Sequence, residues 1–142
     1  MARILIIDDE PQIRSMLTLM LEREGYEIVE APDGVAGIKI YRQNPADLII
    51  TDLFMPEKEG MEIIMELTRD FPGVKIIAIS GAGSLGSTGY LEMARMIGAT
   101  RTLAKPFGQE QLLAAVRAIG DGRKEEAGRS IASLGDALAN DE

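Results

Sequence analysis

The sequence predicts an α/β fold, a doubly wound three-layer sandwich in which helices cover both faces of a parallel five-stranded sheet. Two observations support this fold class. Short apolar runs recur along the chain, and segments with helical spacing separate them. Three of the runs are continuously apolar and rich in β-branched residues, as are strands buried on both faces of a parallel sheet. Five strand–helix units in alternation therefore predict one sheet between two helical layers.

The strands are expected where the apolar runs lie. The three continuously apolar runs are Ile4–Ile7, Leu48–Ile50 and Val74–Ile79. Two further strands are expected at Tyr26–Glu30 and at Thr100–Ala104. Because parallel neighbours need a crossover connection, a helix is expected after each strand.

Helix-end signals and apolar stripes define the helices. The first is expected between Pro11, which suits a first turn, and Gly25, which suits the position after a helix end. Asp33 has the side chain of an N-cap for a second helix that reaches about Gln43. A third helix is expected over residues 60–71. Apolar stripes indicate a fourth helix with Tyr90, Met93, Ala94 and Ile97, and a fifth with Leu112, Ala115, Val116 and Ile119.

Composition restricts the chemistry and the partners. The chain contains no cysteine and no histidine, which excludes disulfides, thiolate zinc sites and imidazole catalysis. Its net charge of −8 makes nucleic acid and anionic membranes poor partners. The N-terminal apolar run stops at Asp8, unlike a signal peptide, and no stretch approaches the roughly 20 apolar residues of a membrane span. A cytoplasmic protein that binds neither nucleic acid nor membrane is expected.

The length of 142 residues indicates one domain with a short appendage. The domain is expected over residues 1–119. A Gly-Asp-Gly break then opens a polar C-terminal tail, residues 120–142, with a weak apolar stripe at Ile131, Leu134 and Leu138. Two interpretations stay open for this tail: disorder, or a short helix that docks on this or another molecule.

Polar side chains stand at the ends of four predicted strands. The first strand ends in Asp8 and Asp9, the third in Asp52 and the fourth in Ser80, and the fifth runs into Lys105. Open α/β sheets bind ligands outside the carboxyl ends of their strands. We therefore expect these five side chains to share one rim.

Three carboxylates at one rim are costly without a cation. A single aspartate after a strand is commonly a helix N-cap, but two unit charges about 4 Å apart repel by roughly 4 kcal/mol at an effective dielectric constant near 20. Such carboxylates raise each other's pKa values and destabilise the fold. A divalent cation, together with Lys105, offsets this cost. Carboxylate oxygens suit Mg²⁺, which takes further ligands from water and a phosphoryl group.

Over about residues 2–119, the sequence resembles the response-regulator receiver domain of two-component signalling, of the chemotaxis type. The matching segments are Ile4-Leu5-Ile6-Ile7-Asp8-Asp9-Glu10, Asp52-Leu53-Phe54-Met55-Pro56 with Gly60, Ile79-Ser80-Gly81-Ala82, Gly98-Ala99 and Lys105-Pro106-Phe107. The resemblance implies the flavodoxin-like strand order 2-1-3-4-5.

The resemblance also implies a phosphoryl acceptor and a metal site. Asp52 would attack a phosphohistidine of a sensor histidine kinase or histidine phosphotransfer protein and form an acyl phosphate. Asp9, Asp52 and the backbone carbonyl of Phe54 would bind Mg²⁺, and Asp8 would act through a bound water. Such a chain is a phosphorylation-controlled binding module rather than an enzyme with an external substrate.

The remaining roles concern the response to phosphate. By the same resemblance, Lys105 would neutralise the phosphoryl oxygens, the Ser80 hydroxyl would hydrogen-bond them, and Pro106 would follow a cis peptide bond. Closure of the loop after Ser80 would then bias a surface formed by the fourth helix, fifth strand and fifth helix, where a downstream protein binds. Phe54 and Ala82 would flank the attacking water and tune the lifetime of the phosphate.

Two features depart from the family pattern. Thr102 stands where receivers commonly carry the Tyr or Phe of a rotamer switch, so switching through an aromatic side chain is not expected. The segment from Ser80 to Gly98 is about three residues longer than is usual in the family. Its glycines predict a mobile loop over residues 81–89 and a displaced or shortened fourth helix.

Three other functions fit the sequence less well. Gly81, Gly83 and Gly86 spell a dinucleotide-type G-x-G-x-x-G, but on the fourth strand–helix unit and without the acidic partner that such a site needs. An aspartyl-phosphate phosphatase of the dehalogenase type needs an acid where this chain has Phe54. A receiver-like fold that serves only as a protein-interaction scaffold stays the main alternative, although it leaves the acidic set unexplained.

Overall fold

The computed structural model describes residues 2–53, 60–80 and 87–119 of the chain. Its elements, in chain order, are β1 (Arg3–Ile7), α1 (Pro11–Arg23), β2 (Glu27–Ala31), α2 (Gly34–Gln43), β3 (Leu48–Asp52), α3 (Gly60–Asp70), β4 (Ile76–Ser80), α4 (Ser87–Ile97), β5 (Arg101–Ala104) and a helix over residues 109–119. The predictions for Phe54, for Ala82 with the other residues of 81–86 and for the 120–142 tail lie outside the described residues.

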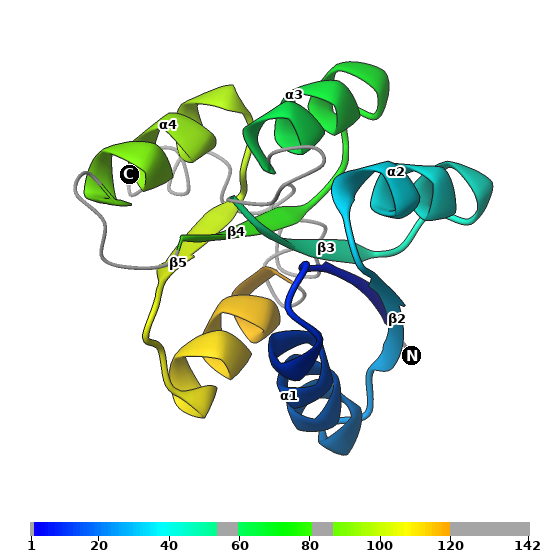
Figure 1. Cartoon of the computed structure of the whole chain (residues 1–142), viewed down its shortest axis with the longest axis vertical. Coiled ribbons are helices and arrows are strands. Elements are labelled where there is room, and N and C mark those ends of the chain that lie inside the picture. The colour runs from blue at the N-terminus through cyan, green and yellow to red at the C-terminus, as the bar shows by residue number, and fades with distance from the viewer. Residues whose placement is uncertain (1, 54–59, 81–86, 120–142) are drawn as a thin grey trace, which may run out of the picture.

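The five strands form one parallel sheet in the order β2-β1-β3-β4-β5, as predicted. Figure 1 shows α2, α3 and α4 on one face of this sheet, and α1 with the 109–119 helix on the other. β1, β3 and β4 lie inside the sheet and are buried almost throughout, whereas the edge strands β2 and β5 are only partly buried. The continuously apolar runs thus correspond to the central strands.

The sheet separates two hydrophobic cores because side chains alternate along a strand. On β1, Leu5 and Ile7 point into the core beneath α2, α3 and α4, whereas Ile4 and Ile6 point into the core beneath α1 and the 109–119 helix. Each of these four side chains is at most 1% exposed. Burying a side chain of this size stabilises the fold by about 1.5–3 kcal/mol, so these four side chains contribute strongly to holding the sheet between its helices.

Local signals account for several helix ends. The Asp33 carboxylate accepts a hydrogen bond from the backbone N–H of Ala36 at 2.8 Å, which confirms it as the N-cap of α2. α4 ends before Gly98, whose φ of +136° lies in the left-handed region that favours glycine. Nearby, the Thr68 hydroxyl of α3 donates to the carbonyl of Ile64 in its own helix at 2.7 Å and lies 3.3 Å from the carbonyl oxygen of Ile97, so α3 and α4 are in contact here.

The prediction for the fourth helix was partly wrong. Residues 87–89, expected to belong to a mobile loop, form the first turn of α4. With eleven residues α4 is as long as α3, so it is not shortened, and the alternative of a displaced helix stays a prediction. Gly89 lowers helix propensity by about 1 kcal/mol relative to alanine. The burial of Ala94 and the packing of Leu91 and Ile97 against the core outweigh that penalty.

Candidate metal and phosphoryl site

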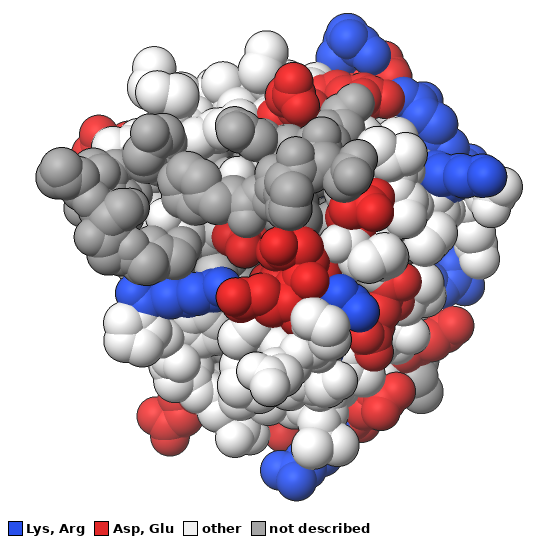
Figure 2. All heavy atoms as spheres, viewed as in Figure 1, with Lys and Arg blue, Asp and Glu red and all other residues white. Residues whose placement is uncertain are grey.

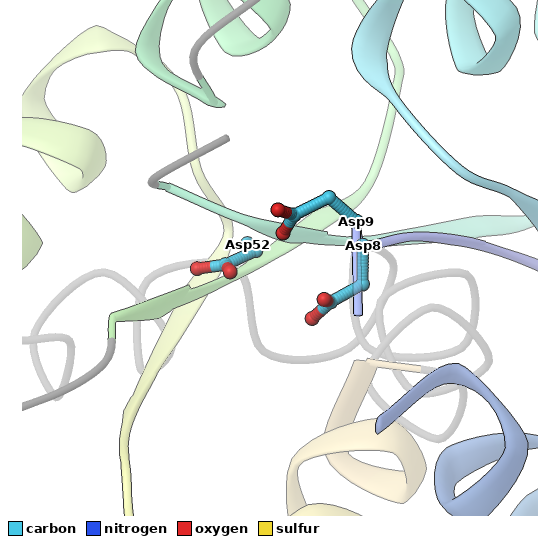
Figure 3. A group of neighbouring side chains, drawn as sticks. All are labelled: Asp8, Asp9 and Asp52. Carbon is cyan, nitrogen blue, oxygen red and sulfur yellow. The ribbon is translucent and has the colours of Figure 1, made fainter. Parts of the chain in front are cut away.

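The carboxyl ends of β1 and β3 bring three aspartates together. β1 and β3 are neighbours, with Ile7 opposite Thr51, so the residues that follow Ile7 lie beside Asp52. One carboxylate oxygen from each of Asp8, Asp9 and Asp52 lies within 4.8 Å of the other two. Figure 3 shows the three side chains gathered around one space. The predicted rim therefore exists among the described residues.

Asp8 is the most constrained member of this cluster. Only 1% of the residue is exposed. Its Oδ1 accepts a hydrogen bond from the backbone N–H of Glu10 at 2.9 Å, and its own N–H donates to the carbonyl of Ala31 at 3.2 Å. Its Oδ2 is buried and receives no hydrogen bond from the described residues. Burial is the main cause of a raised pKa at Asp8.

Asp9 and Asp52 differ in their access to solvent. Asp9 is solvent-accessible, whereas Asp52 is only 6% exposed at the end of β3. The backbone around Asp52 is fixed on both sides: Leu53 N–H donates to the carbonyl of Ile79 at 2.9 Å and Gly60 N–H to that of Leu53 at 3.0 Å. The carboxylate of Asp52 is therefore presented from a rigid part of the sheet.

Gly60 lets α3 begin against the backbone of Asp52. A Cβ atom at this position would lie 2.6 Å from the Cα of Leu53 and would overlap the carbonyl oxygen of Asp52. Real Cβ atoms are not found so close to backbone atoms, so a side chain here would force β3 and α3 apart. The sequence motif included Gly60, but the reason for a glycine at this position became visible only in three dimensions.

Lys105 supplies the positive charge of the rim. Its Nζ lies 3.9 Å from Asp52 Oδ2 and 3.9 Å from Glu10 Oε1. Its backbone N–H donates to the carbonyl of Ser80 at 2.8 Å, and the peptide bond to Pro106 is cis, as the family pattern implied. In Figure 2 an acidic group occupies the middle of one face with basic side chains beside it.

Ser80 is the last member of the predicted rim, and Thr102 stands at the position of the usual aromatic switch. Ser80 ends β4, is 1% exposed, and its hydroxyl oxygen makes no hydrogen bond with the described residues. Thr102 lies on β5 opposite Ala78 and is half-buried. The position of the usual aromatic switch is thus occupied by a short side chain within the β5 edge.

Sequence reasoning missed two residues next to the rim. Glu10 belongs to the motif after the first strand and had no predicted role, but its carboxylate is an ion-pair partner of Lys105. Arg14, one turn into α1, donates from Nη1 to the carbonyl oxygen of Asp8 at 2.7 Å. The only sequence signal was its place one helical turn after Glu10, a spacing that puts side chains of a first turn near the preceding loop.

The donor set fits a hard divalent cation. Carboxylate oxygens from Asp8, Asp9 and Asp52 approach one another closely, and Asp8 Oδ2 is a buried acceptor without a hydrogen bond from the described residues. Mg²⁺ is bound by one or two carboxylates together with water and phosphate oxygens, which matches this arrangement. Within the described part of the chain, no helix has the length and apolar character needed to cross a membrane.

Comparison with known proteins agrees with this geometry. The sequence profile of the response regulator receiver domain matches residues 4–117. The response regulator GtcR of Aneurinibacillus migulanus is 39% identical over 115 residues, which are 81% of this chain and 46% of that protein. Protein PilH of Pseudomonas aeruginosa is 34% identical over 119 residues, 84% of this chain and 98% of that protein.

A solved structure shows the same fold. The crystal structure of the Thermotoga maritima response regulator TrrA, in complex with Mg²⁺ and BeF, aligns with a TM-score of 0.75 at 32% identity, over 84% of this chain and 99% of that one. The chain spans less than half the length of several curated relatives that it matches, GtcR among them. The family profile covers most of the chain and includes the acidic rim, so this chain belongs to the response regulator receiver domain family.

Proposed function

We propose that the chain accepts a phosphoryl group on Asp52 from the phosphohistidine of a sensor histidine kinase or a histidine phosphotransfer protein, and that Mg²⁺ is required. The observation that carries the proposal is the surroundings of the Asp52 carboxylate. Two further carboxylates lie within 4.8 Å, and the ammonium of Lys105 lies 3.9 Å away. A buried carboxylate flanked by both signs of charge suits an acceptor of a charged group.

The transfer needs little covalent work beyond Asp52 itself. One carboxylate oxygen of Asp52 forms the new bond to phosphorus while the phosphorus–nitrogen bond breaks, and its electron pair returns to the departing imidazole. Lys105 neutralises charge on the phosphoryl oxygens from its position 3.9 Å from Asp52 Oδ2. The Ser80 hydroxyl, buried and free of hydrogen bonds to the described residues, donates to a phosphoryl oxygen once one is present.

Asp8, Asp9 and Asp52 would hold the cation, together with the backbone carbonyl of Phe54 that the family pattern implies. When bound, Mg²⁺ neutralises the carboxylates and the phosphoryl oxygens. The Thermotoga maritima relative in complex with Mg²⁺ and BeF supports this part of the proposal. The buried Asp8 Oδ2 supports it independently, because an acceptor without a donor is otherwise costly by about 1–3 kcal/mol.

The output is a change of binding surface rather than turnover of an external substrate. Phosphorylation adds roughly −1.5 to −2 charges and three strong acceptors at Asp52. We propose that Ser80 responds first and that a downstream protein reads the change on α4, β5 and the 109–119 helix in the cytoplasm. Because Thr102 replaces the usual aromatic residue, this response would run through Ser80 and the segment that follows it.

The test is acceptor chemistry in vitro. The protein is incubated with acetyl phosphate in the presence of Mg²⁺ or of EDTA, and its mass is measured intact. We expect a gain of one phosphoryl group that requires Mg²⁺ and disappears in Asp52→Asn, whereas Asp47→Asn, which removes a carboxylate at the other end of β3, keeps it. Absence of any modification in the wild type, with a folded protein, would favour a protein-interaction scaffold. Steady hydrolysis of external phosphoesters would favour a phosphatase.

A further inference from the structure

A chain of polar contacts connects the acidic rim to the edge of the sheet. Arg14 Nη1 donates to the carbonyl of Asp8 at 2.7 Å, and Arg14 Nε donates to Glu30 Oε1 at 3.3 Å. The second oxygen of Glu30 accepts from the Thr18 hydroxyl at 3.0 Å. Thr18 and Arg14 lie four residues apart on α1 and therefore on one face of the helix. The guanidinium thus bridges β2 and the β1–α1 loop.

This bridge acts on a segment that has few other anchors. The loop after β1 carries Asp8, Asp9 and Glu10 in immediate succession. α1 begins after Glu10 without a side-chain cap among the described residues, and its first turn holds the loop through the backbone bond from Arg14 N–H to the carbonyl of Glu10 at 3.0 Å. The backbone of Asp8 is held by two groups, the carbonyl of Ala31 on its N–H and Arg14 on its carbonyl. Loss of the Arg14 side chain removes the hydrogen bond on the Asp8 carbonyl, while the bonds of the Asp8 N–H to Ala31 and of the Glu10 N–H to Asp8 Oδ1 remain.

We propose that Arg14 is a positioning residue of the cation site: it holds the Asp8 carbonyl, and with it the Asp8 and Asp9 carboxylates, while Glu30 and Thr18 orient its guanidinium. The inference rests on the proposed function, because it concerns the same cation site. The contacts of Arg14 among the described residues are with the Asp8 carbonyl and Glu30, so it acts through the backbone that it fixes. A fork-shaped guanidinium suits this role, since it donates to two acceptors in a set geometry.

The chain contains a matched control pair at the other end of β2. Arg3 Nε lies 3.4 Å from Glu27 Oε2 and links β1 to β2, as the pair of Arg14 and Glu30 links α1 to β2. Both arginine side chains are mostly buried, with 26% and 17% exposed. Removal of either pair costs an arginine–glutamate contact of the same kind, but only one of the pairs touches the loop of the carboxylates.

The experiment measures Mg²⁺ affinity by calorimetric titration of the full chain, with the free energy of unfolding in EDTA as a second readout. Outer contacts of metal ligands typically change metal affinity 10–100-fold when they are removed. We expect the dissociation constant to rise about tenfold in Arg14→Met and about threefold in Glu30→Gln. Arg14→Lys, with a single ammonium in place of the fork, should lie between wild type and Arg14→Met. Arg3→Met should stay within about twofold of wild type.

A merely structural role predicts a different pattern. In that case Arg14→Met and Arg3→Met lower the free energy of unfolding alike and leave Mg²⁺ affinity unchanged, a result that overturns the inference. If Arg14→Met does not fold, Glu30→Gln and Thr18→Val decide the question, and wild-type affinity in both also overturns it. A wild type that binds no Mg²⁺ would instead remove the proposed function, so the two failures are distinguishable.

Discussion

Replacing Asp8 with asparagine should make the protein more stable when no divalent cation is present. The carboxylate oxygens of Asp8, Asp9 and Asp52 lie within 4.8 Å of one another. Two unit charges at that separation repel by about 3.5 kcal/mol at an effective dielectric constant near 20. The ammonium of Lys105, 3.9 Å from Asp52 Oδ2, offsets part of this repulsion. A net gain of about 1–2 kcal/mol in the free energy of unfolding is therefore expected for Asp8→Asn.

The dependence on pH has a definite sign. Burial raises the pKa of Asp8 above its value in the unfolded chain, which is near 4. Below about pH 4 the carboxyl is protonated in both the folded and the unfolded state, and the neutral Asp8 contributes its full share to the free energy of unfolding. As the pH rises through the raised pKa of the folded state, Asp8 becomes charged in a buried position. Its contribution to the free energy of unfolding is then lost. Wild type in EDTA should therefore lose stability over this range, and Asp8→Asn should lack this component of the loss.

The assay is urea unfolding followed by far-UV circular dichroism, in EDTA and in about 10 mM Mg²⁺. A ligand that binds only the folded state raises its stability by RT ln(1 + [L]/Kd), so the wild type should gain stability with Mg²⁺ and Asp8→Asn should gain much less. Asp47→Asn is the control, since it makes the same change in charge at the other end of β3. The reasoning is refuted if Asp8→Asn is less stable than wild type in EDTA, or if Mg²⁺ stabilises both equally.

Three further predictions concern the fold that presents the site. Gly60→Ala should lower the free energy of unfolding by about 1–3 kcal/mol and weaken Mg²⁺-dependent phosphorylation, because the new Cβ overlaps backbone atoms. Gly73→Ala is the control, since a Cβ at that position has open space around it. In the same urea and mass assays it should change neither stability nor phosphorylation. Asp33→Ala should lower the free energy of unfolding by about 1 kcal/mol, because the N-cap of α2 is lost. Its Mg²⁺ affinity in a calorimetric titration should equal that of the wild type, and an altered affinity would contradict this prediction. Ile49→Ala should cost about 2–5 kcal/mol in urea unfolding, whereas Leu19→Ala, at a side chain 55% exposed, should cost less than about 0.5 kcal/mol; equal losses would refute the assignment of the core.

The sequence predicted most of the fold because its strongest signals are local. A run such as Ile4–Ile7 fits only a strand covered on both faces, and Asp33 at the start of a helical stripe has a clear capping role. The strand ends were less well placed: β2 begins and ends one residue later than expected, β3 ends two residues later and β4 begins two residues later. A strand ends where pairing with its neighbours ends, and an apolar run alone does not show that position.

The residues of the candidate site could be predicted from the sequence, but the contacts that hold them in place could not. Asp8, Asp9, Asp52 and Lys105 each stand at a strand end, and parallel strands bring such ends to one rim. The contact of Arg14 with the Asp8 carbonyl has no such signal, because it depends on how α1 packs beside β2. The start of α4 was misjudged for a related reason: glycine spacing is a local property, whereas burial of the helix is a tertiary one.

The two carboxylate oxygens of Asp8 differ in their hydrogen bonding, which affects the binding of a cation at the proposed site. Oδ1 is engaged by the N–H of Glu10, so the carboxylate has already lost its rotational freedom in the folded protein. Ordering a mobile side chain on binding opposes association by about 0.5–1.5 kcal/mol. Asp8 avoids that entropic cost because it was ordered during folding. At the proposed cation site, Mg²⁺ uptake beside Asp8 should then depend on the dehydration of the ion and on the mutual repulsion of the carboxylates rather than on ordering of the Asp8 side chain.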